Sequence, residues 1–375
     1  MHDLVIRGGR LVDGTGAPER IADVAITDGV IVAIGDDVGE SRRTLDASGL
    51  LVTPGFVDVH THYDGQATWD PELAPSSLHG VTTTVFGNCG VGFAPAVRGE
   101  AEHEWLIQLM EGVEDIPGTA LHEGLSWNWS SFPEYLDELE RRPRDIDLGT
   151  QLPHGALRLH VMGERGATQE PATPDDIAEM ARLAREAVEA GALGFSTSRT
   201  LNHRTSLGEL TPTLRAEADE LVGIATALGE AKKGVLQAVT DFIDRDAELD
   251  LFERMASESG RPISVSIAQG AKTGDDWRVE LARFAEASAR GVQMRGQVGA
   301  RAVGLMLGLE ATLHPFMFSE PYQAIADRPL AERVAVMHDP ELRRKIIEGA
   351  RVDDTSLGSR AIHRYRFIFQ LGDPP

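Results

Sequence analysis

The sequence is poor in cysteine, in positive charge and in long apolar runs, and each shortage excludes a class of protein. A single cysteine cannot form a disulfide within the chain and suits a reducing compartment. The net charge of -23, from 36 basic and 59 acidic residues, argues against nucleic acid and anionic membranes as partners. Residues 1–9 contain charges and glycines, unlike a signal peptide. No segment approaches the roughly 20 apolar residues of a membrane span, so we expect a cytoplasmic protein.

Short strands with glycine or aspartate turns are predicted in the first 54 residues, at residues 3–9, 22–26, 29–35 and 49–52. Further strands are predicted to start near residues 56, 81, 146, 192, 235, 262 and 292. Helices are predicted at 173–188, 216–229, 248–259, 277–290, 305–309, 330–337 and 341–351. The alternation of strand and helix indicates a parallel sheet, and no eighth strand is evident.

An insertion near residues 95–144 separates the second and third of these strands. Its composition, rich in tryptophan and acidic residues, predicts short helices and loops. We expect Trp127 and Trp129 to pack the insertion onto the rest of the fold. The segment 154–158, after the third strand, is expected to be a loop.

Two histidines, His60 and His62, stand two residues apart in the segment PGFVDVHTH at residues 54–62. In a strand they would share one face, where two neutral imidazoles can bind one divalent ion. The alternative is a histidine pair on a solvated strand edge. The strand is bounded by Pro54-Gly55 and by turn residues after Tyr63, which favours an ordered site.

Cys89 lies in the segment HGVTTTVFGNCGV at residues 79–91, where a predicted strand ends in a glycine-flanked turn. A lone cysteine is commonly a small buried apolar residue, and that alternative stays open. The end of a strand is, however, where parallel barrels keep their chemistry.

The β-rich start followed by PGFVDVHTH resembles the urease-related amidohydrolase superfamily. The second segment resembles the N-acyl-D-amino-acid deacylases (D-aminoacylases), in which the cysteine of GNCG is a zinc ligand. The resemblance implies an α/β fold with a TIM (β/α)8-type barrel at residues 55–375 and a β-sandwich portion at residues 1–54. It also implies one zinc ion, held by His60, His62 and Cys89, whose activated water splits an N-acyl amino acid into a free amino acid and a carboxylate.

The sequence departs from that family in three ways. No histidine occurs between His203 and His314, so the metal ligands expected on the fifth and sixth strands are missing, and nearby Gln237 and Gln269 are poor zinc ligands. This argues against a binuclear centre. The aspartate that is the family's general base has no match, and the chain is expected to be C-terminally truncated. An incomplete barrel would expose a sheet edge, which favours a homo-oligomer.

Five other polar residues are candidates for substrate binding because they lie near the ends of predicted strands. Arg199 could bind a carboxylate bidentately or pair with an acid of its own loop. Asp64 could contact substrate or form an Asx turn. The full set is Asp64, His154, Ser198, Arg199 and His203.

Two other functions stay open. A catalytically degenerate barrel that binds a ligand or partner would explain the missing residues. A cyclic-amide hydrolase would need a bridging lysine on the fourth strand, and residues 192–197 contain none. The motifs fix neither the acyl group nor the preference for D or L substrates.

Overall fold

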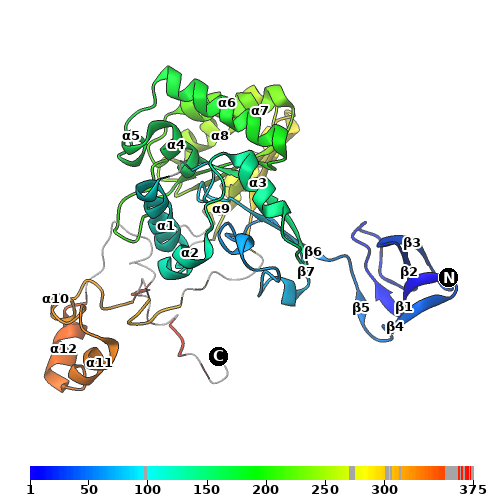
Figure 1. Ribbon diagram of the computed structural model, residues 1–375, viewed down its shortest axis with the longest axis horizontal. Helices are drawn as coiled ribbons and strands as arrows, with labels where there is room; N and C mark the ends of the chain where they lie inside the picture. Colours follow the sequence, from blue (N-terminus) through cyan, green and yellow to red (C-terminus); the bar gives the residue numbers. More distant parts are fainter. Residues whose placement is uncertain are drawn as a thin grey trace. The chain divides into compact units, whose positions relative to one another are not determined.

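The chain forms two compact units in a computed structural model (Figure 1). The structure describes residues 1–96, 99–269, 275–299, 304, 306–311, 314–350, 362–363, 365, 368–370 and 372. One unit contains Met1–Asp58 and Ala74–Thr83, and the other contains Val59–Leu73 and Thr84–Pro375. No helix in these described ranges is long and apolar enough to cross a membrane.

The first unit contains a five-stranded sheet of order β3-β2-β1-β4, with β5 paired to β1. β1 runs antiparallel to β2 and parallel to β4 and β5. The strands are β1 (His2–Leu11), β2 (Arg20–Thr27), β3 (Val30–Gly35), β4 (Ser41–Asp46) and β5 (Leu51–Val52). The predicted strands are confirmed, but β4 was missed because Arg42 and Arg43 hide its pattern. Leu11, Ala22 and Val24 form a small core here.

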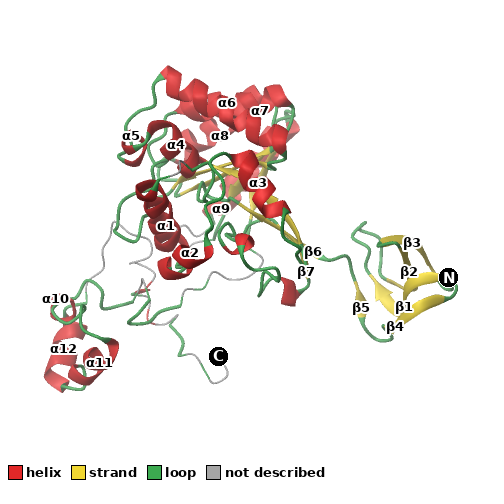
Figure 2. Ribbon diagram, viewed as in Figure 1, coloured by secondary structure: helices red, strands yellow, loops and turns green. Residues whose placement is uncertain are grey.

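The second unit contains a parallel sheet of order β13-β12-β11-β10-β9. Its strands are β9 (Leu152–Pro153), β10 (Gly194–Arg199), β11 (Val235–Thr240), β12 (Ile263–Ser266) and β13 (Met294–Gln297). The intervening helices are α6 (Pro174–Ala190), α7 (Ala218–Ala231), α8 (Arg245–Ser259) and α9 (Asp276–Ala289). The predicted alternation and parallel pairing are therefore confirmed, and the strands lie below α6 and α7 in Figure 2.

A further sheet has the order β6-β7-β8 and consists of β6 (Phe56–Asp58), β7 (Val81–Phe86) and β8 (Asp147–Thr150). Two single-turn 3-10 helices, η1 (Gln66–Thr68) and η2 (Ser77–His79), lie between β6 and β7. After β13 the described residues contain no strand, which agrees with the absence of an evident eighth strand in the sequence.

The described part of the insertion contains helices joined by loops, as predicted: α1 (Glu100–Glu114), α2 (Gly118–Gly124) and α3 (Phe132–Glu140). Trp129 is fully buried and donates a hydrogen bond to the Phe93 carbonyl oxygen at 2.7 Å. The tryptophan therefore packs the insertion against the chain that follows Cys89.

The expected loop at residues 154–158 is wrong, because this segment begins helix α4 (His154–Met162), which is followed by α5 (Glu164–Ala167). Its alanine, leucine and arginine residues are strong helix formers, and Gly163 follows its last residue. The expected start of α6 is confirmed: Thr173 caps it in a capping box with Asp176, and Pro174 is the first helical residue.

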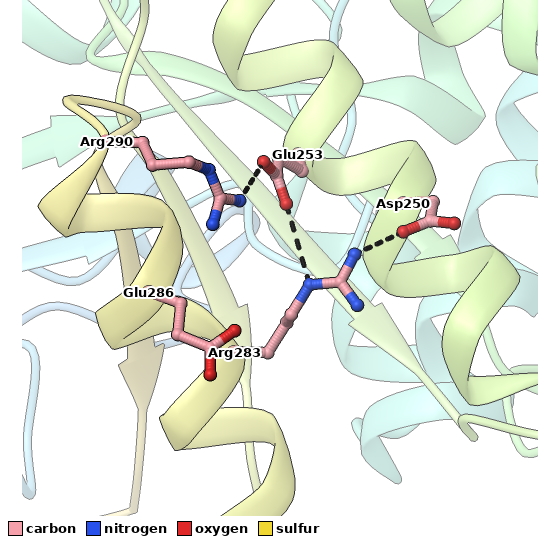
Figure 3. A pocket seen from close by; sticks show the side chains of 5 residues that line it. All are labelled: Asp250, Glu253, Arg283, Glu286 and Arg290. Atoms are coloured by element: carbon pink, nitrogen blue, oxygen red, sulfur yellow. Dashed lines mark hydrogen bonds and ion pairs between the residues drawn. The ribbon is translucent and has the colours of Figure 1, made fainter.

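Charged side chains join α8 to α9 around a surface hollow, shown in Figure 3. Arg283 pairs with Asp250 and with Glu253, and Arg290 pairs with Glu253. Such exposed pairs contribute about 1 kcal/mol or less each. Because these groups bind one another across the helix contact, we assign the hollow a role in packing.

Among the residues described after β13 there are three short helices: α10 (Glu320–Gln323), α11 (Leu330–Val336) and α12 (Pro340–Glu348). They pack around Tyr322, Ile325 and Ile346. The helices predicted at 330–337 and 341–351 are confirmed with shifted ends, although position 351 lies outside the described residues. The helix predicted at 305–309 is absent from residues 306–309, and position 305 is not described.

Candidate metal centre

His60 and His62 lie just beyond the end of β6, which stops at Asp58. The prediction that both belong to the strand is therefore wrong, because the chain bends at His60. One backbone hydrogen bond nevertheless joins the chain after β6 to β7: the Thr61 amide donates to the Val85 carbonyl oxygen at 2.9 Å. The two imidazole rings still meet, with centroids 5.4 Å apart.

Cys89 is placed by a tight turn that follows β7. Gly87, Cys89 and Gly90 all have positive φ, at +72°, +55° and +68°. A Cβ at Gly87 would come within 2.1 Å of the Gln151 carbonyl oxygen, so only glycine fits there. The Cys89 amide donates to Gln237 Oε1 at 2.8 Å, which fastens the turn to β11.

The three predicted ligands form one cluster. Each of His60, His62 and Cys89 offers a ligand atom, and these atoms all lie within 4.8 Å of one another. His60 Nε2 is 3.1 Å from Cys89 Sγ. His62 Nδ1 is buried and has no hydrogen-bond partner. Two imidazoles and a thiol are donors that suit Zn²⁺, and the buried His62 Nδ1 is available as a ligand.

Two residues that sequence reasoning missed hold the imidazoles. Gln297, at the end of β13, places Oε1 2.6 Å from His60 Nδ1. Glu114, at the end of α1, places Oε1 3.2 Å from His62 Nε2. Gln297 could have been found, because it ends a predicted strand at the same sheet edge as the other candidates. Glu114 could not, because nothing in the sequence shows where the insertion folds.

Burial sets the protonation of the cluster. It lowers the pKa of His62 well below 6.5, helped by the positive forms of His60 and His203. It raises the pKa of the Cys89 thiol, and the negative charges of Glu114 and Asp64 act in the same direction. Burial, with Asp115, raises the pKa of Glu114 to about 7. At neutral pH the His62 imidazole is therefore neutral, as metal binding requires, while the Cys89 thiol must lose its proton to bind.

The predicted substrate residues have different surroundings. His154 is completely buried between the Thr197 hydroxyl and the Glu220 carboxylate, at 2.9 and 2.8 Å, so both of its ring nitrogens have partners within the protein. His154 lies on helix α4, which packs against β10, and not on the loop expected from the sequence. Arg199 binds Glu248 of α8 through Nε, so it pairs with an acid of a helix and not with one of its own loop, as the alternative expected.

The remaining candidates lie closer to the cluster. Ser198 Oγ is 2.8 Å from His203 Nδ1. Burial, together with His60, lowers the pKa of His203 to about 4. Asp64 is 1% exposed with Oδ2 unpartnered, and burial raises its pKa to about 8. Their contact with a substrate stays a prediction.

The buried His154 predicts a pH dependence of stability. Burial lowers its pKa below the ordinary 6.5, although the hydrogen bond to Glu220 opposes the shift. Below pH 6.5 the unfolded chain therefore binds a proton that the folded protein does not, and the unfolding free energy decreases as pH falls. His154→Gln should flatten this dependence in urea unfolding between about pH 7.5 and 5.5. An unchanged slope would contradict the buried, neutral state of His154.

The fold and the site together define a mixed α/β protein with a histidine–cysteine cluster suited to a metal ion. The model of the amidohydrolase family matches residues 43–356. The chain therefore belongs to the amidohydrolase family.

Its relatives include a D-aminoacylase from Alcaligenes xylosoxydans xylosoxydans, 35% identical over 227 residues, which are 60% of this chain and 42% of the relative. A solved D-aminoacylase studied for its binuclear metal centre has a TM-score of 0.66 and 28% identity, over 80% of this chain and 58% of that one.

The N-acyl-D-glutamate deacylase of Bordetella bronchiseptica, solved with zinc and a phosphonate inhibitor, gives a TM-score of 0.63 and 30% identity, over 79% of this chain and 58% of that one. The chain thus spans less than half the length of the D-aminoacylase relative.

Proposed function

We propose that this protein is a metal-dependent amidohydrolase that removes the acyl group from N-acyl amino acids. The observation that carries the proposal is the cluster of His60, His62 and Cys89, whose ligand atoms lie within 4.8 Å of one another. A relative named D-aminoacylase and a structural neighbour named N-acyl-D-glutamate deacylase support the substrate class.

We further propose one zinc ion at this cluster. A zinc ion there supplies Lewis acidity toward an amide carbonyl and toward water. The chain's own residues orient the ligands: Gln297 fixes His60, and the Gln237 contact fixes the turn that carries Cys89. Gln237 uses its oxygen on the Cys89 amide, and the fifth and sixth strands offer no histidine, which supports a single ion.

The proposal includes a barrel architecture. Seven strands would follow one another around this barrel: β6, β7, the adjacent pair β8 and β9 taken as one strand, β10, β11, β12 and β13. The helices between β9 and β13 would cover its outside. We also propose an N-terminal β-sandwich portion at residues 1–54 and a barrel at residues 55–375. We further propose that the protein is cytoplasmic.

The proposed reaction is tested with zinc-loaded protein and a panel of N-acetyl-D- and N-acetyl-L-amino acids, with release of free amino acid as the readout. We expect hydrolysis of at least one enantiomeric series, and loss of it after chelation. Binding of the same compounds without turnover would support the degenerate barrel instead.

The cyclic-amide alternative has less support. The relatives reported above are a D-aminoacylase and an N-acyl-D-glutamate deacylase, and no lysine lies at residues 192–197.

A further inference from the structure

We infer that Glu114 is a positioning residue of the metal centre, whose carboxylate holds His62 in the orientation and tautomer that bind the ion. The inference rests on the proposed function, because it assumes that His62 is a ligand. Glu114 is the last residue of α1, so its carboxylate reaches the cluster from the insertion. Its Oε1 lies 3.2 Å from His62 Nε2, and the side chains are 25% and 12% exposed.

The two histidines are held in matching ways. The amide oxygen of Gln297 can only accept, so the proton of His60 lies on Nδ1, and the lone pair of Nε2 points toward Cys89 Sγ, 3.1 Å away. In its ionised form the Glu114 carboxylate likewise only accepts, so it keeps the proton of His62 on Nε2 and leaves the lone pair on Nδ1. That Nδ1 is the buried atom without a partner. Metal-bound histidines commonly donate their other N–H to such a group.

The end of α1 is positioned firmly enough for this role. Gly112 lies two residues before Glu114, and a Cβ there would come within 2.2 Å of the Arg204 carbonyl oxygen. The Ser206 amide also donates to the Gln108 carbonyl oxygen at 2.8 Å. The last turns of α1 therefore lie directly against the segment that follows His203, which fixes the Glu114 backbone.

The same helix offers a matched control. Glu104 and His122 form a second histidine–carboxylate pair, with Oε2 3.0 Å from Nε2. Both side chains are about half exposed, at 45% and 54%, and neither belongs to the cluster. A change at Glu104 therefore removes the same kind of contact from the same helix without touching His62.

The test measures zinc affinity by competition with a chromophoric chelator in the full chain and in three variants. Glu114→Ala should lower the affinity about 10- to 100-fold, as loss of a residue that orients a metal ligand does. Glu114→Gln should cause a smaller loss, because its amide oxygen still accepts a hydrogen bond from Nε2–H. Glu104→Ala should match the wild type within about twofold. With Co²⁺ in place of zinc, only the Glu114 variants should change the visible absorption bands.

Three results would overturn or redirect the inference. Wild-type affinity in Glu114→Ala overturns it, and if that variant does not fold, wild-type affinity in Glu114→Gln does so. Equal losses in Glu114→Ala and Glu114→Gln would also overturn it, because a direct metal ligand behaves in that way. Absence of zinc binding by the wild type would instead refute the proposed function.

Discussion

Replacing Cys89 by alanine should abolish stoichiometric zinc binding and, with it, any hydrolysis of N-acyl amino acids. The thiol is one of three clustered donors, and its Sγ lies 3.1 Å from His60 Nε2. Removal of a direct ligand should exceed the roughly 10- to 100-fold loss of affinity that follows removal of an outer partner. Zinc content after gel filtration and release of free amino acid are the two measurements.

Folding of the Cys89→Ala variant is the necessary control. The change removes a single buried sulfur, so the metal-free variant should unfold within about 1 kcal/mol of the metal-free wild type. The contacts of the Cys89 amide and of Gly90 remain, because the backbone makes them. A variant that keeps both zinc and activity would show that Cys89 is only a packed apolar side chain.

Replacing Glu220 by alanine should destabilise the protein by about 3–5 kcal/mol, the cost of breaking a buried ion pair on one side. Glu220 Oε1 accepts from His154 Nε2 and from Arg158 Nε, both at 2.8 Å. Arg158 and His154 are 0% exposed, and Glu220 is 1% exposed. The variant leaves the Arg158 charge buried without its carboxylate. Urea unfolding at neutral pH measures the difference.

Asp219→Ala is the matched control for Glu220. Asp219 precedes Glu220 on α7, but its side chain is 82% exposed and pairs weakly with Arg254 at 3.4 Å. Its loss should change the unfolding free energy by about 0.5 kcal/mol or less. A Glu220→Ala variant as stable as Asp219→Ala would mean that the carboxylate does not stabilise the α4–α7 contact.

Much of the fold follows from local pattern. Apolar strands such as Val235–Thr240 alternate with capped helices such as α6, and that alternation is sufficient to predict parallel pairing. Elements without such a pattern were missed. The charged β4 looks like a loop, and α4 begins directly after a two-residue strand, where no separate start signal stands out.

The candidate site was predictable only where its residues follow strands. His60, His62 and Cys89 do so, and the order of the strands brings them together. His154 also follows a strand, but α4 turns it into the interior, where Glu220 binds it. Glu114 comes from a helix of the insertion, and its place depends on tertiary packing that no periodicity reveals.

Zinc content of the purified chain tests the central claim most directly. We expect one zinc per chain by mass spectrometry, and a lower melting temperature after the metal is removed by chelation. A ligand present at about 1,000 times its Kd stabilises a protein by about 4 kcal/mol, so the shift should be readily measured. A full chain without stoichiometric zinc, whose melting temperature chelation leaves unchanged, would contradict the assignment of His60, His62 and Cys89 as a metal centre.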